Sequence, residues 1–216
     1  MIKNRTVQLI FQSAFCNLGI IGIIASFGFF EYTFRGDFFV HFTNLSNYLC
    51  IGIMFAELIQ TAKKREDSYV KVQPVLKFIG MLMILFTFFV FNIMLAPARE
   101  AYLNYRIASV LFHVVLPIMY VADWFLFYER GQIRWYHPLM SAVAPIAYVI
   151  FVYVRAWILN FDTQVPYLYP YFFLNLDTQG VDGVAKWIAI LSVGFIALGY
   201  IFFGLDKIKL PNKKSS

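Results

Sequence analysis

The stretch Leu76–Leu95, LKFIGMLMILFTFFVFNIML, decides the fold of this chain. Lys77 is its only charged residue. A helix needs about 20 apolar residues to cross a hydrocarbon layer of roughly 30 Å. A strand of a membrane barrel would instead alternate apolar and polar residues over about 10 positions. Because this stretch is continuously apolar, it predicts a membrane-spanning helix.

Five other apolar runs have the same character. Of the 216 residues, 61% are hydrophobic and 14% are charged, and the charged residues gather between the runs. The sequence therefore predicts an all-α membrane protein, a single transmembrane domain over residues 1–216 that forms a six-helix bundle. The predicted spans are Val7–Phe30, Thr43–Ile59, Leu76–Leu95, Ile107–Phe127, Pro138–Ile158 and Val184–Phe203.

The distribution of basic residues predicts the topology. Thirteen Lys and Arg residues fall on the side that holds both chain ends, against five on the other side. Positive charge stays in the cytoplasm, so we expect both termini to be cytoplasmic and the protein to be multi-pass in the plasma membrane. The first run lacks a small-residue cleavage site, and we expect it to be a retained helix.

Composition also argues against several function classes. The net charge of +6 comes from residues that flank the spans, which does not indicate nucleic-acid binding. The two cysteines, Cys16 and Cys50, lie within predicted spans and do not suggest a disulfide framework. The three histidines, His41, His113 and His137, fall at different depths without ligand spacing, so we expect no metal and no cofactor.

Polar residues form a stripe along the second predicted span. Thr43, Asn47, Cys50 and Glu57 share one helical face, because they are separated by four, three and seven residues. The stripe predicts either hydrogen bonding between helices or a polar surface inside the protein that contacts a ligand. The spacing leaves both possibilities open.

The fourth span carries His113, roughly 9 Å in from its outer end at a rise of about 1.5 Å per residue. Pro117 has no N–H for the carbonyl of His113, which predicts a kink and room beside the imidazole. Pro145 likewise leaves the carbonyl of Ser141 without its helical donor. His113 fits either a structural role or a place in a site.

Five polar residues from four spans lie at a common predicted depth. They are Thr43, Asn47, Asn92, His113 and Arg155. Arg155 either extends towards water or holds an anion. The aromatic-rich external segment 160–183 has no Lys or Arg, and it forms either an interfacial belt or a lid over a cavity.

Glu57 and Asp123 lie towards the inner ends of their spans, where we expect ion pairs near Lys63, Arg130 and His137. Asp123 is ten residues from His113, about 15 Å along the helix axis, so it cannot orient that imidazole. Any acidic partner of His113 comes from elsewhere, with Asp177 a candidate.

Three motifs carry a resemblance to known families. They are Phe42–Asn47 (FTNLSN), His113–Pro117 (HVVLP) followed by Asp123 and Trp124, and Tyr167–Leu174 (YLYPYFFL) leading to Gly180. The chain resembles a family of bacterial six-helix membrane proteins. More distantly it is similar to the androgen-induced and androgen-dependent membrane proteins of animals, hydrolases of fatty acid esters of hydroxy fatty acids. That resemblance implies Thr43 and His113 as the catalytic pair. Two features differ from the animal pattern: the interval from His113 to Pro117 is one residue shorter, and Asn44 replaces an apolar residue.

The resulting hypothesis is an intramembrane hydrolase of lipid or fatty acyl esters. A neutral imidazole takes the proton of the threonine hydroxyl as it attacks the ester carbonyl. Asn47 or Asn92 would donate to the oxyanion, and Arg155 would bind a substrate carboxylate. The alternatives are a small-molecule transporter or channel-like protein and a non-enzymatic scaffold. The lipid bilayer is the expected partner in every case, and the sequence does not indicate an oligomeric state.

Overall fold

The computed structural model describes residues 2, 4–63, 73–98, 100, 103, 105–159 and 168–208. Its described part is all-helical and has no strands, which confirms the predicted fold class. Several residues that entered the topology prediction lie outside the described residues. They are Lys3, Lys64, Arg65, Lys71, Arg99, Lys209, Lys213 and Lys214.

Six helical rods in the described part are long and apolar enough to cross a membrane, the architecture of a multi-pass membrane protein. Three of them combine several helical elements. The rods are α1 (Arg5–Ser26); α2 (Phe42–Lys63); α3 (Pro74–Val90) with the π-helical turn η2 (Phe91–Leu95) and the 3₁₀ turn η3 (Ala96–Ala98); α5 (Ile107–Val110) with the π-helical turn η4 (Leu111–Val115) and α6 (Leu116–Phe127); α7 (His137–Ser141) with α8 (Val143–Leu159); and α9 (Leu176–Lys207), which includes a kink at Gly180.

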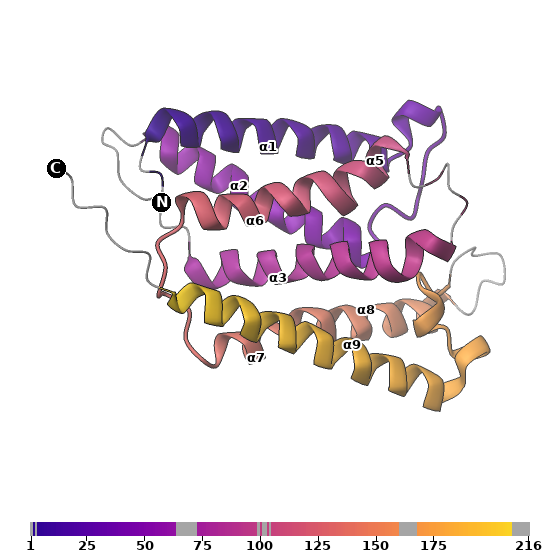
Figure 1. The fold of residues 1–216 in the computed structure, drawn as a ribbon. Coiled ribbons are helices and arrows are strands. Elements are labelled where there is room, and N and C mark those ends of the chain that lie inside the picture. The colour runs from indigo at the N-terminus through magenta and orange to yellow at the C-terminus, as the bar shows by residue number, and fades with distance from the viewer. Residues whose placement is uncertain are drawn as a thin grey trace.

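The six rods run roughly parallel or antiparallel, so the bundle has two ends (Figure 1). We call the end at which α1 begins and α9 ends the near end, and the opposite end the far end. An even number of spans places both chain ends on one side, as Figure 1 shows for these two helices.

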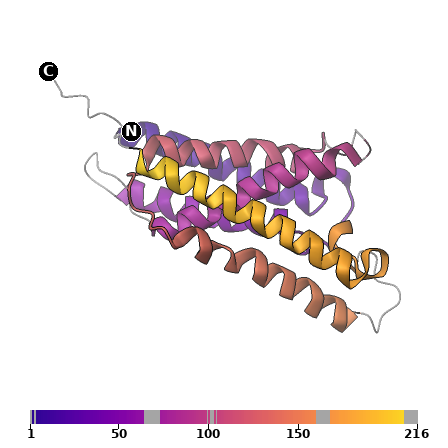
Figure 2. The ribbon, with the colours of Figure 1, turned by 60° about the horizontal axis from the view of Figure 1, so that its bottom comes forward.

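The rods differ in how deeply they are buried. In the most apolar windows of α1, α2, α3 and the α5–α6 rod, 39–50% of residues are buried, and these four rods pack together. The α7–α8 rod and α9 have only 17% buried and lie against α3, as Figures 1 and 2 show. In a bilayer most of the surface of these two rods therefore contacts lipid.

Several rod ends differ from the predicted boundaries, and local chemistry explains two of them. α1 ends at Ser26, and Gly28 at φ +84° turns the chain into the 3₁₀ turn η1 (Phe29–Glu31). A Cβ at Gly28 would lie 1.8 Å from the carbonyl oxygen of Thr33, so only glycine fits. α9 begins eight residues before the predicted start, because the side chain of Asn175 caps the backbone N–H groups of Asp177 and Thr178. Helix capping and turn geometry thus determine where these helices begin and end, and hydropathy does not show these positions.

The prolines act where they were predicted to act. Near Pro117 the helix takes the form of the π-helical turn η4, and His113 is its central residue. Asn92 Nδ2 donates to the carbonyl oxygen of His113 at 3.2 Å and so supplies the hydrogen bond that Pro117 cannot. The fifth span is interrupted at Ala142, three residues before Pro145. π-helical turns are frequent at functional sites.

Candidate functional site

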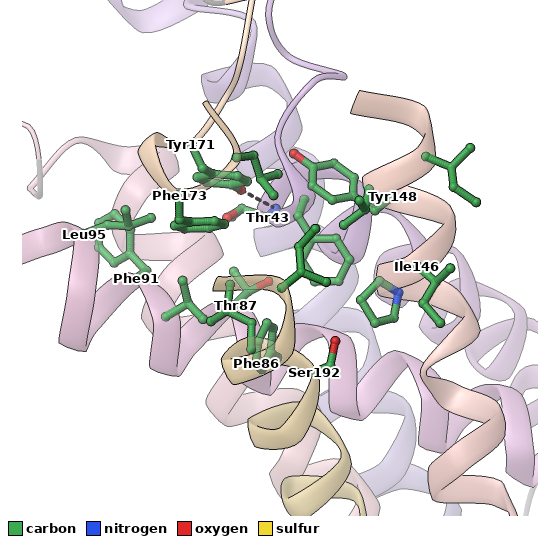
Figure 3. A pocket seen from close by; sticks show the side chains of 18 residues that line it. Thr43, Phe86, Thr87, Phe91, Leu95, Ile146, Tyr148, Tyr171, Phe173 and Ser192 are labelled. Atoms are coloured by element: carbon green, nitrogen blue, oxygen red, sulfur yellow. Dashed lines mark hydrogen bonds between the residues drawn. The ribbon is translucent and has the colours of Figure 1, made fainter. Parts of the chain in front are cut away.

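Two adjoining cavities lie at the far end of the bundle. The first, which we call the apolar cavity, has a volume of about 180 Å³ and lies between η2, α3, α8 and α9 (Figure 3). The second, the polar cavity, has a volume of about 300 Å³ and lies between the α1–α2 connection, α5 and η4. Both are lined by Thr43, Phe91, Leu95 and Tyr171, which therefore form their boundary.

The two cavities suit different chemical groups. Aromatic and aliphatic side chains dominate the wall of the apolar cavity, including Phe86, Tyr148, Ile188 and Leu191. A cavity of roughly 150 Å³ is enough for benzene in an engineered protein, so several methylene groups would fit here. The polar cavity instead carries ionisable groups at its rim. These are Glu31, Arg35, Asp37, His41 and Arg106.

Thr43 is a buried residue of the first turn of α2, and 7% of it is exposed. Its backbone N–H is one of the orphan donors of a helix N-terminus, where the helix dipole favours negative charge. The Thr43 N–H reaches the hydroxyl oxygen of Tyr171 at 3.5 Å (Figure 3). The hydroxyl of Thr43 thus lies beside donors that could stabilise an anion.

His113, on η4, also lines the polar cavity. Its Nδ1 lies 2.9 Å from the carbonyl oxygen of Ser109. Since a carbonyl only accepts, Nδ1 carries the proton, and in the neutral ring Nε2 keeps the lone pair that a base requires. The ring also stacks on Phe91, with centroids 3.4 Å apart and planes at 12°. Ser109 therefore performs the orienting role for which Asp177 had been a candidate.

The structure brings Thr43 and His113 to one cavity, but no hydrogen bond between described residues joins their side chains. In enzymes without substrate, nucleophile and base are often farther apart than in the reacting complex. A water molecule or the substrate itself could bridge them in a cavity of this size.

Asn47, Asn92 and Arg155 have other contacts. Asn47 Nδ2 donates to the carbonyls of Thr43 at 2.8 Å and Phe112 at 3.0 Å. Asn92 Nδ2 donates to Phe88 O at 2.8 Å besides its bond to His113 O. These two amides hold the backbone of the candidate catalytic residues, and their donors are already used. Arg155 donates to Leu168 O at 3.1 Å and is not among the residues that line either cavity.

The described part of the external segment covers the cavities. Tyr171 and Phe173 stack with centroids 5.0 Å apart, and both line the apolar cavity. Burial of its hydroxyl raises the pKa of Tyr171, which keeps it a neutral O–H donor. These contacts with the cavities are what the lid alternative predicts; residues 160–167, the other part of the segment, lie outside the described residues. In the sequence Tyr171 is one of several aromatic residues of this segment, and nothing there distinguishes it from the others.

Polar residues of α2 beyond Thr43 are used in helix packing. Cys50 of the stripe donates its Sγ hydrogen to Gly80 O at 3.2 Å. Ser46, beside the stripe, has its hydroxyl 3.0 Å from that of Thr87. All are buried. Beyond Thr43, the stripe therefore joins α2 to its neighbours, as the helix-to-helix alternative predicted.

No family model, curated protein or solved structure matches the chain. Its function is therefore inferred from the site.

Proposed function

We propose that this protein is an intramembrane hydrolase of lipid or fatty acyl esters, with Thr43 as nucleophile and His113 as general base. One observation carries the proposal: Thr43 lines both cavities, while His113 lines the polar one. An acyl ester has two parts that match the two cavities, because its apolar chain is attached to a polar ester linkage. With the chain in the apolar cavity, its carbonyl would lie at the boundary, beside Thr43.

The residues suggest a complete sequence of proton transfers. His113 Nε2 takes the proton of the Thr43 hydroxyl as the oxygen attacks the ester carbonyl. The imidazolium then returns this proton to the leaving alkoxide, which departs and leaves an acyl-threonine. A water molecule, deprotonated by the same nitrogen, then attacks the acyl carbon. The carboxylic acid leaves, and the imidazolium returns its proton to the Thr43 oxygen, which restores the hydroxyl.

The oxyanion of each tetrahedral intermediate needs donors. We assign this role to the Tyr171 hydroxyl and to the Thr43 backbone N–H, which would turn from the Tyr171 oxygen, 3.5 Å away, to the oxyanion. The side chains of Asn47 and Asn92 do not take this role, because each donates both amide hydrogens to backbone carbonyls. The two asparagines are positioning residues that hold the carbonyls of Thr43 and His113. Where the substrate carries a carboxylate, Arg35 or Arg106 would bind it, because both line the polar cavity and Arg155 does not.

The proposal includes an orientation. The near end faces the cytoplasm of a plasma-membrane protein, as the count of basic residues predicts, and the cavities open towards the outer leaflet. The resemblance to membrane ester hydrolases supports the same reaction class.

The decisive experiment uses purified full-length protein in lipid nanodiscs with a fatty acyl ester whose released acid is quantified. Thr43→Ala and His113→Ala should each reduce turnover to background. Thr61→Ala is the matched control, since Thr61 is also a buried threonine of α2 and its hydroxyl donates to a helical backbone carbonyl, Glu57 O, at 2.9 Å. Equal turnover in the wild type and both cavity variants would exclude this mechanism. Covalent labelling of Thr43 by an acylating probe provides an independent readout.

A further inference from the structure

Three charged side chains form a buried cluster near the opposite end of the bundle. Lys77 Nζ lies 2.7 Å from Glu57 Oε2 and 2.7 Å from Asp123 Oδ2. All three side chains are at most 2% exposed. The residues come from α3, α2 and α6, three of the four rods that pack together. The predicted ion pairing of Glu57 and Asp123 is confirmed, but its cation is Lys77 and not Lys63, Arg130 or His137.

The charges of this cluster do not balance when all three groups are ionised. Two carboxylates and one ammonium leave one negative charge inside the protein, at the depth of the membrane. An uncompensated charge in such a place is expensive, and buried groups commonly change protonation state instead. Binding one positive charge would make the cluster neutral and remove this cost.

Two unused oxygens show where that charge would go. Glu57 Oε1 and Asp123 Oδ1 are buried and have no hydrogen-bond partner among the described residues. The other oxygen of each carboxylate faces the ammonium of Lys77, which offers donors only. A proton would therefore bind to Glu57 Oε1 or Asp123 Oδ1 and make the cluster neutral.

Among the residues that the structure describes, the groups around the cluster do not provide a substitute cation. Cys16 from α1, Cys50 from α2, Tyr120 from α6 and the adjacent Tyr128 are the titratable groups that interact with it. Lys77 Nζ lies 4.1 Å from the ring centroid of Tyr120 and 6.0 Å from that of Tyr128. Thiols and phenols are neutral at pH 7. Burial also raises the pKa of Tyr128, which keeps it neutral.

We propose that the cluster of Glu57, Lys77 and Asp123 is a proton-binding site that holds one proton between its two carboxyl groups at neutral pH. The proton enters from the near end. Lys77 is three residues from the start of α3, about 4.5 Å along its axis, whereas the cavities lie at the other end. The site is independent of the proposed hydrolase activity.

Infrared spectroscopy of the full-length protein in nanodiscs tests the proposal at pH 7. The wild type should show the C=O band of a neutral carboxylic acid, shifted in D₂O. Glu57→Gln and Asp123→Asn should each abolish the band. In either variant the charge of the remaining carboxylate balances that of Lys77, so this carboxylate stays ionised. Asp206→Asn is the matched control: Asp206 is also buried with an unpartnered Oδ1, but it accepts from Ile133 N–H at 3.0 Å. Its substitution should leave the band of the cluster unchanged.

Thermal unfolding gives a second readout. Each single substitution should leave the midpoint close to that of the wild type, since an amide resembles the protonated acid. The double variant Glu57→Gln/Asp123→Asn isolates the ammonium of Lys77 and should lower the midpoint by roughly 10 °C. A wild type without the neutral-acid band, or a band that survives both single substitutions, would overturn the proposal. So would a midpoint raised by sodium but not by choline chloride, because a metal ion would then balance the charge.

Discussion

The two ends of the bundle use the same kinds of side chain in different ways. At the far end, Thr43 and His113 line cavities and are held mainly through backbone contacts. At the near end, the charges of Glu57, Lys77 and Asp123 are directed at one another, with no more than 2% of any side chain exposed. The two ends therefore differ in the space beside their polar groups. A polar residue in a membrane span can contact a ligand only where its neighbours leave a cavity next to it.

The largest expected effect separates catalysis from stability. His113→Gln should lower turnover about 10³-fold, since it removes the general base but keeps a polar side chain. Glu57→Gln, the same substitution type at the near end, should leave turnover within about twofold. Steady-state kinetics on both variants in nanodiscs measures this. A comparable loss in Glu57→Gln would break the division between the two ends.

Lys77→Met should have the largest effect on stability. It leaves two buried carboxyl groups without their cation, and breaking a buried ion pair from one side typically costs about 3–5 kcal/mol. Unfolding by a denaturing detergent, followed by circular dichroism, checks the value. A variant as stable as the wild type would show that the cluster contributes little to the fold.

Tyr171→Phe should lower turnover about 10²-fold with little change in KM. The substitution removes the hydroxyl but retains the ring that stacks on Phe173, so the lid should remain in place. Tyr169→Phe, on the same segment, is the control. If Tyr171→Phe and Tyr169→Phe lower turnover by the same factor, the Thr43–Tyr171 contact has no role in the reaction.

Gly22→Ala tests the packing of α1 beside the polar cavity of the far end. A Cβ at this position of α1 would lie 2.4 Å from the Phe112 ring, so the substitution should cost about 1–3 kcal/mol. Gly52→Ala, whose Cβ would meet nothing within 4 Å, should cost nothing and is the control. Equal unfolding midpoints for the two variants would contradict the close α1–η4 contact.

The smallest expected effect concerns substrate choice at the rim. Arg106→Gln should raise KM up to about tenfold for an ester that carries a carboxylate and leave KM for an uncharged ester unchanged. Arg106 Nε lies 3.4 Å from Glu31 Oε1 and is about one third exposed, which limits the gain from any ion pair. An equal rise for both esters would indicate a structural role for Arg106.

Part of the candidate site could be foreseen from the sequence. Polar residues are costly in hydrocarbon, so Thr43 and His113 stand out within apolar runs, and Pro117 marks an irregular helix beside one of them. The contribution of Tyr171 could not be foreseen. It lies 128 residues from Thr43 in the sequence, on a segment where many aromatic residues look equivalent.

The number and the apolar character of the spans follow from the amino-acid sequence alone. A helix crosses a membrane because of its length and apolarity, and both are properties of a continuous stretch such as Leu76–Leu95. Only the tertiary structure decided which polar side chains meet: Lys77 reads as a flanking charge, yet it lies fully buried between carboxylates from two other helices. Such contacts depend on the rotation of each helix about its own axis. Packing between helices sets this rotation, and the hydropathy of the chain contains no information about it.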